Sequence, residues 1–327
     1  MSTSTPFIPP TWPATVFYIA SIVILPLYFF IFFSLLRLRL VSKTYDTTFY
    51  TILLQHCIAD LLAMSFYFII IVARGITFIR EFYFEYQEFY IAAAAYNHIY
   101  YTLYIRCTGI VLLSFQRYLV IAHHHSSITT RVQNAPKVGI IGVYWVLPTL
   151  ISLVVLKDTN FKYDSLETMA VIADQEVIQR NTLMALIIVS LTCILCSTAY
   201  GALFIFVRKN SARLSKSLRR ELSLAIQVFI LLLAFFAILF YYSFQNYFAQ
   251  THNTGPIFYM RSIYPMANGF LSYINPFCII FLNKDLTKQV IKSMTCKRFK
   301  SDVQVSGIVS NSAKQLQQRK GVNQVTF

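Results

Sequence analysis

The sequence predicts an all-α protein built as a bundle of seven transmembrane helices, and its composition and its apolar stretches are the observations that predict it. Of the 327 residues, 57% are hydrophobic and 13% are charged. This charged fraction is about half that of an ordinary soluble domain. A water-soluble fold of this length could not bury so much apolar surface, so we expect the excess to face lipid.

Seven apolar stretches follow one another along the chain, and a bilayer span needs about 20 such residues. Hydrocarbon offers no water to unpaired backbone amides, so each stretch is expected to form an α-helix. The predicted spans are Ala14 to Leu36, Phe49 to Ala73, Ile91 to Ile121, Val138 to Leu156, Leu183 to Val207, Leu222 to Phe248 and Phe258 to Leu282.

Lysine and arginine residues predict the orientation of the bundle, because positive residues near span ends are retained in the cytoplasm. The segments after spans one, three, five and seven hold 18 of them, and the segments on the opposite side hold five. We therefore expect a plasma-membrane protein with an extracellular N-terminus (1–13), a seven-helix domain (14–295) and a disordered cytoplasmic tail (296–327). The net charge of +15 then favours anionic membrane lipids and requires no nucleic acid.

The positions of the cysteines favour a role in helix packing over disulfide or metal sites. None lies in the two long outer linkers, so no extracellular disulfide is expected. Cys193 and Cys196 have a spacing found in zinc sites, but a lone pair inside an apolar helix favours packing, and we predict no metal and no cofactor. Cys296 follows the last span beside two basic residues, which makes it a candidate for lipidation or an ordinary free thiol.

Two charged residues lie at mid-depth in the predicted spans, where an ionisable group is costly and is usually paired or functional. Asp60 lies in span two and Arg106 in span three. Arginine does not readily lose its proton, so we expect the two side chains to face each other across the bundle. The alternative is that Arg106 extends outward to the membrane surface.

Three short motifs resemble those of rhodopsin-type receptors, in the same order along the chain. They are Asp60 within Ile58-Ala59-Asp60-Leu61-Leu62, Gln116-Arg117-Tyr118 at the end of span three, and Asn275-Pro276 in span seven. The surrounding sequence resembles the nematode serpentine chemoreceptors, of class gamma or a near relative, in Phe115 to Tyr118, Ile274 to Phe277 and Asn283 to Leu286. The resemblance implies a chemosensory receptor that binds a small molecule and couples to a heterotrimeric G protein.

The resemblance also implies roles for single residues. Arg117, Tyr118, Asn275 and Pro276 match positions used in activation and G-protein coupling. Gln116 stands where the family usually has an acid, so we predict that Glu221 at the start of span six holds Arg117 in the resting state. The alternative is that Glu221 pairs locally with Lys216, Arg219 or Arg220.

Other departures concern the usual switch residues. Ile279 stands where the family has the tyrosine of Asn-Pro-x-x-Tyr, and span six lacks Cys-Trp-x-Pro. Arg106 precedes Arg117 by about three helical turns and shares its face. In rhodopsin-type receptors that position lies beside the span-two aspartate, in a pocket that often holds sodium. Here we expect the Arg106 guanidinium to take that place, pairing with Asp60 near Ser272 and Asn275.

Aromatic and polar residues gather at the outer ends of spans three, six and seven, which is typical of a small-molecule pocket. Tyrosines that anchor helices at the membrane interface have the same composition. The ligand-binding candidates are Asn97, His98, Tyr101, Thr102, Tyr242, Gln245, Tyr264 and Asn268.

The sequence also bears on two further function classes. We find no Ser/His/Asp set or carboxylate pair in a water-accessible position, so an enzyme is not predicted. A ligand-gated ion channel with an inverted seven-helix topology is the main alternative. It would need a cytoplasmic N-terminus, which the distribution of lysine and arginine opposes.

Overall fold

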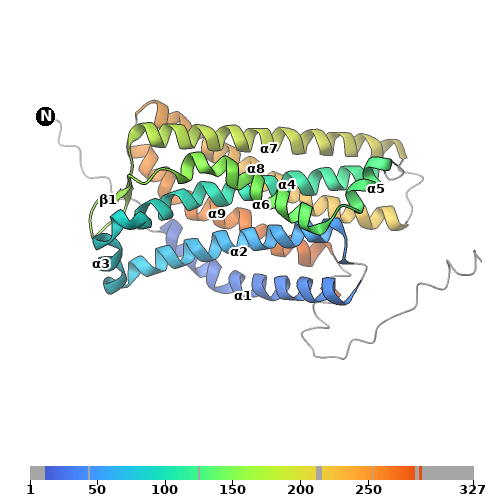
Figure 1. Cartoon of the computed structure of the whole chain (residues 1–327), viewed down its shortest axis with the longest axis horizontal. Coiled ribbons are helices and arrows are strands. Elements are labelled where there is room, and N and C mark those ends of the chain that lie inside the picture. The colour runs from blue at the N-terminus through green and yellow to red at the C-terminus, as the bar shows by residue number, and fades with distance from the viewer. Residues whose placement is uncertain are drawn as a thin grey trace, which may run out of the picture. The chain divides into compact units, whose positions relative to one another are not determined.

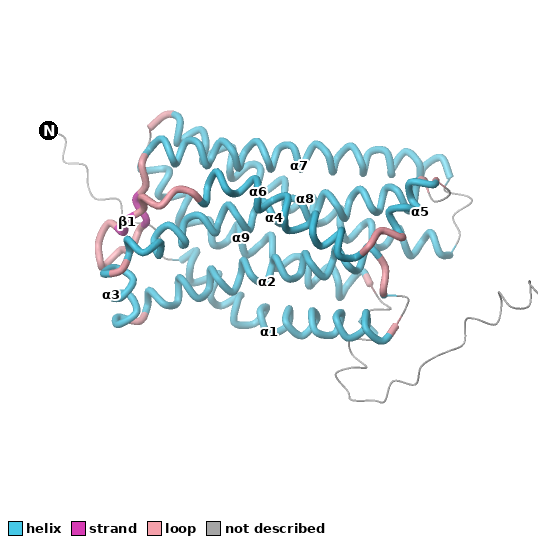
Figure 2. The backbone as a smooth tube through the Cα atoms, viewed as in Figure 1, coloured by secondary structure: helices cyan, strands magenta, loops and turns pink. Residues whose placement is uncertain are grey.

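A bundle of long helices dominates the computed structural model, which describes residues 12–42, 45–123, 126–210, 216–252, 254–283 and 287–288 (Figures 1 and 2). Within these residues, seven helices are long and apolar enough to cross a membrane. The seven-span all-α fold predicted from the sequence is therefore confirmed. The seven helices are α1 (Trp12–Val41), α2 (Thr48–Gly75), α4 (Ala92–Ala122), α6 (Lys137–Leu156), α7 (Gln175–Asn210), α8 (Lys216–Gln250) and α9 (Thr254–Leu282).

Short elements lie at both ends of the bundle, and the sequence did not predict them because each is too short to register in a search for spans. We call one end the hairpin end: it carries α3, a π-helical turn and two paired strands (Figure 1). The other, the α5 end, carries one short helix. These elements are α3 (Thr77–Glu85), the π-helix (Gln87–Ile91), β1 (Lys162–Tyr163), β2 (Val171–Ile172) and α5 (Ser127–Gln133).

Helix α7 begins eight residues before the predicted span, at Gln175 rather than Leu183. Its first two turns carry Glu176 and Arg180, so hydropathy alone assigns them to a linker. The turns nevertheless pack on the bundle, because Ile178 joins a buried cluster with Ala249 and Ile257. Hydropathy thus locates the part of a helix that matches lipid and misses a polar end held by tertiary packing.

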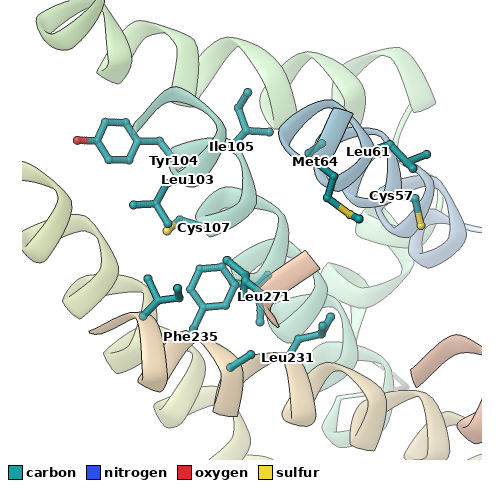
Figure 3. Close-up of a cluster of buried hydrophobic side chains, with 14 of the residues drawn as sticks. Cys57, Leu61, Met64, Leu103, Tyr104, Ile105, Cys107, Leu231, Phe235 and Leu271 are labelled. Atoms are coloured by element: carbon teal, nitrogen blue, oxygen red, sulfur yellow. The ribbon is translucent and has the colours of Figure 1, made fainter. Parts of the chain in front are cut away.

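Helix α4 is the central helix of the bundle, since it contacts α2, α6, α7 and α8. Figure 3 shows its side chains Leu103 and Cys107 in one buried cluster with Phe235 of α8 and Leu271 of α9. Helices α1 and α6 are the least buried spans, and their large apolar side chains point outward, as expected for surfaces in contact with lipid. Cys193 and Cys196 lie in the core as free thiols.

Gly109 brings α4 close to two neighbouring helices. A Cβ atom built there would lie 2.5 Å from His56 Nδ1 on α2 and 2.6 Å from the Tyr144 hydroxyl on α6. Those two side chains are buried and lie 3.2 Å apart, joined by a hydrogen bond. Neither can move aside without disturbing the core, so a side chain at this position would overpack the three-helix contact.

We predict that Gly109→Ala lowers the stability of the folded protein by about 1–3 kcal/mol, because overpacking outweighs the gain in helix propensity. The measurement is thermal unfolding in detergent. Gly142→Ala on α6 is the matched control, since nothing lies within 4 Å of its added methyl group. An equal midpoint for the two variants would contradict the close approach at Gly109.

Candidate functional site

A buried arginine ties α4 to α9 at the centre of the bundle. The Arg106 guanidinium is 1% exposed. Its Nη1 donates to Ser272 Oγ at 2.9 Å, and its Nη2 donates to Asn268 Oδ1 at 2.6 Å. Its Nε donates to the Thr102 carbonyl one turn back along α4 at 3.3 Å. These contacts rule out the outward-extended alternative, because the guanidinium lies inside the bundle.

Asp60 anchors a second polar group, which joins α2 to α1 and α9. The Tyr28 hydroxyl donates to Asp60 Oδ2 at 2.7 Å, and Asn275 Nδ2 donates to the same oxygen at 3.1 Å. His56 Nε2 lies 3.9 Å from this carboxylate. The Asp60 side chain is completely buried. A carboxylate at this depth is held by donors from two neighbouring helices and lies close to an imidazole.

The expected direct pairing of Asp60 with Arg106 is wrong. Over the described ranges, no ion pair joins the two side chains. The reason is that α9 separates their partners: Ser272 accepts from Arg106, whereas Asn275, one turn further on, donates to Asp60. Helix α9 therefore bridges the two charges with neutral groups.

A cavity of about 350 Å³ lies at the hairpin end. Helices α2, α4, α8 and α9 form most of its walls, and Val171 of β2 contributes to its rim. Its volume lies within the range of small-molecule pockets, and seven of its 18 lining residues are aromatic. Three of the predicted ligand-binding residues line it: Tyr242, Gln245 and Tyr264.

The other five ligand-binding candidates lie outside the lining of this cavity. Asn97 donates to the Tyr90 hydroxyl and to the Asp158 carbonyl, and Asn268 accepts from Arg106. The remaining three lie along α4 and face other neighbours: His98 stacks on Phe66 at 4.1 Å, the Tyr101 hydroxyl meets Thr149, and Thr102 donates to the His98 carbonyl. Helical spacing placed the candidates on helices that line the cavity, but it could not show which polar groups are already hydrogen-bonded within the fold.

The cavity is also lined by residues that were not among the predicted ligand-binding candidates. Tyr96 and Tyr100 lie one turn apart on α4, and their hydroxyls are 3.1 Å apart. Arg261 of α9 lines the same cavity. The available signal for Arg261 was its position inside predicted span seven, because charged residues in a span are rarely retained without a role.

At the α5 end, Arg117 and Glu221 form the predicted ion pair between α4 and α8. The Arg117 side chain is 2% exposed, and its guanidinium carbon lies 3.5 Å from the centre of the Phe49 ring. Both charged residues line a second cavity, of about 360 Å³. The Tyr118 hydroxyl lies 2.9 Å from His123 Nε2 and is therefore engaged apart from the ion pair of Arg117 and Glu221.

A surface ion pair braces the rim of this second cavity. Lys137 Nζ lies 2.5 Å from both carboxylate oxygens of Asp46, and Arg39 Nε lies 3.4 Å from one of them. The hydrogen bond from Lys137 holds the pKa of the Asp46 carboxyl below its ordinary value. The pair of Lys137 and Asp46 therefore joins the connection between α1 and α2 to the start of α6 at neutral pH, and it weakens as acid protonates Asp46.

A family comparison agrees with this arrangement of seven spans. The family model described as serpentine type 7TM GPCR chemoreceptor Srv matches residues 17–296. The chain belongs to the Srv family of serpentine chemoreceptors. No individual curated protein matches it significantly.

Membership of the Srv family confirms the predicted serpentine chemoreceptor and names its subfamily. This chain is therefore a multi-pass membrane protein of a receptor family and not of an enzyme family. Among the residues assigned to activation, Pro276 lies within α9 directly after Asn275. Cys296 and the tail lie outside the described residues, as do the side chains of Lys216, Arg219 and Arg220.

Proposed function

We propose that this Srv chemoreceptor binds a small molecule in the cavity at the hairpin end and signals through a heterotrimeric G protein at the α5 end. The observation that carries the proposal is that α4 connects two cavities of similar size. One is aromatic and suits an organic ligand. The other contains the buried pair of Arg117 and Glu221, which a conformational change could open.

The distribution of charge supports an extracellular hairpin end. The α5 end carries Arg37, Arg39 and Lys137, and further basic residues follow α7 and α9 in the sequence. Positive residues of this kind are retained in the cytoplasm. The proposed site of action is the plasma membrane, with the ligand arriving from outside and anionic lipids contacting the basic inner end.

A route between the two ends runs along α9. Tyr264 lines the ligand cavity, and its hydroxyl lies near the Arg106 guanidinium. One turn further on, Asn268 accepts directly from Arg106, and Ser272 and Asn275 follow on the same helix. A ligand that shifts Tyr264 would therefore change the fit of α9 against α4 and, through their shared neighbours, the position of α8.

The pair of Arg117 and Glu221 supports a restrained resting state. Gln116 offers no carboxylate to its neighbour, so the restraint is supplied by α8 instead of by the adjacent residue. Because Arg117 is buried, loss of Glu221 would leave an uncompensated charge inside the bundle and favour conformations that expose Arg117.

We predict that Glu221→Gln raises signalling in the absence of ligand by about fivefold or more, since a coupling of 1–3 kcal/mol changes a population by that factor. The measurement is basal G-protein activation in cells matched for surface expression. Glu88→Gln is the matched control, because Glu88 is 75% exposed and its ion pair with Lys162 lies at the hairpin end. A basal level equal to that of the control would mean that the ion pair does not restrain activation.

The function itself is tested by a G-protein activation screen of volatile and water-soluble small molecules. We expect at least one compound to activate the wild-type receptor and to fail with Arg117→Ala, because Arg117 lies at the proposed coupling surface. A compound that instead evokes a membrane current independent of Arg117 would contradict the proposal and favour the ion channel.

A further inference from the structure

We propose that the cavity at the hairpin end selects ligands that carry a carboxylate on an apolar body, and that Arg261 is the residue that binds the carboxylate. This inference rests on the proposed function, because it assumes that the cavity is the ligand site. It goes further by naming the chemical class of the ligand.

One edge of the Arg261 guanidinium is hydrogen-bonded, and the other is buried without a hydrogen-bond partner among the described residues. Nη1 donates to the Val171 carbonyl of β2 at 3.1 Å. Nε and Nη2 are buried and have no hydrogen-bond partner among the described residues. These two nitrogens lie in one plane on the same side of the guanidinium, which matches the two oxygens of a carboxylate. The unpaired edge formed by Nε and Nη2 therefore suits a bidentate contact with a carboxylate.

The surroundings hold the guanidinium in place before any ligand arrives. Its central carbon lies 5.5 Å from the centre of the Tyr96 ring and 5.7 Å from that of Phe258. Val171 itself is fixed by the hairpin, where it pairs with Tyr163, whose backbone N–H donates to the Gln87 side chain at 2.6 Å. A cation oriented in this way loses little conformational entropy when an anion binds.

No acidic residue of the described hairpin end compensates Arg261. It is the one lining residue of the cavity with a formal charge at neutral pH, and it forms none of the ion pairs of the described chain. Two acids of this end form ion pairs with other residues: Glu88 with Lys162, and Asp158 with Arg180. An uncompensated, partly desolvated guanidinium gains most from an anionic ligand.

The rest of the lining defines the remainder of the ligand. Tyr67, Tyr100, Tyr241 and Tyr264 supply aromatic surface, and the polar atoms between them are few. A ligand without a charged group could fill the same space, but it would leave the guanidinium unpaired. Sites that bury such a group discriminate strongly against analogues that lack its partner. The cavity therefore favours a small organic acid over its neutral counterpart.

The test uses the full-length receptor purified in detergent and a panel of straight-chain and phenyl-substituted alkanoic acids, each compared with its primary amide. Thermal unfolding reports binding without any G protein. We expect at least one acid to stabilise the receptor, with an affinity about tenfold or more above that of its amide, since a charged hydrogen bond contributes on the order of 1.5–3 kcal/mol. Equal stabilisation by acids and amides, or none by any acid, would overturn the inference.

Variants assign the effect to one residue. Arg261→Gln is expected to abolish the preference for acids, and Arg261→Lys to recover only part of it, because an ammonium keeps the charge and loses the planar fork. Lys162→Gln, which removes an exposed positive charge outside the cavity, is expected to leave it unchanged. An acid preference that survives Arg261→Gln would contradict the assignment. The unfolding assay measures binding and not signalling. A failure of the carboxylate proposal is therefore distinguishable from a failure of the proposed receptor function.

Discussion

Hydrocarbon does not solvate a charge, and this constraint determines the position of each charged side chain inside the bundle. Arg106 donates hydrogen bonds to Asn268 and Ser272. Asp60 accepts hydrogen bonds from Tyr28 and Asn275. Arg117 forms an ion pair with Glu221 on the neighbouring helix α8. Each of these contacts joins two helices. The charges therefore hold the bundle in one arrangement more specifically than lipid-like side chains could, because apolar packing alone does not distinguish lipid from helix.

Helix α4 organises these contacts by depth. Tyr96 and Tyr100 line the cavity at the hairpin end, Arg106 lies at the centre, and Arg117 lies near the α5 end. Helix α9 lies beside α4 at the cavity and at Arg106, and α8 supplies the partner of Arg117. The proposed function requires one region that binds a small molecule and another that couples to the G protein. In this chain, a single buried helix contacts both regions, and its polar partners lie on the helices that would have to move.

The sequence predicted the parts of this arrangement that depend on composition or on an unavoidable charge. The seven spans follow from apolar length, and the pair of Arg117 and Glu221 follows from the missing acid at Gln116. The sequence could not predict that Asp60 and Arg106 would each have neutral partners on α9, because that outcome depends on which turn of α9 lies beside each charge. For the same reason it could not separate Tyr242, which lines the cavity, from Asn97, whose amide is used to hold a loop.

The account depends most directly on the orientation of the bundle, because the aromatic cavity must face outward for a chemoreceptor and the pair of Arg117 and Glu221 must face the cytosol. An epitope fused ahead of Met1 measures this orientation in living cells. We expect an antibody to label it on intact cells as strongly as after permeabilisation. Labelling that appears only after permeabilisation would place the cavity inside the cell and contradict the account.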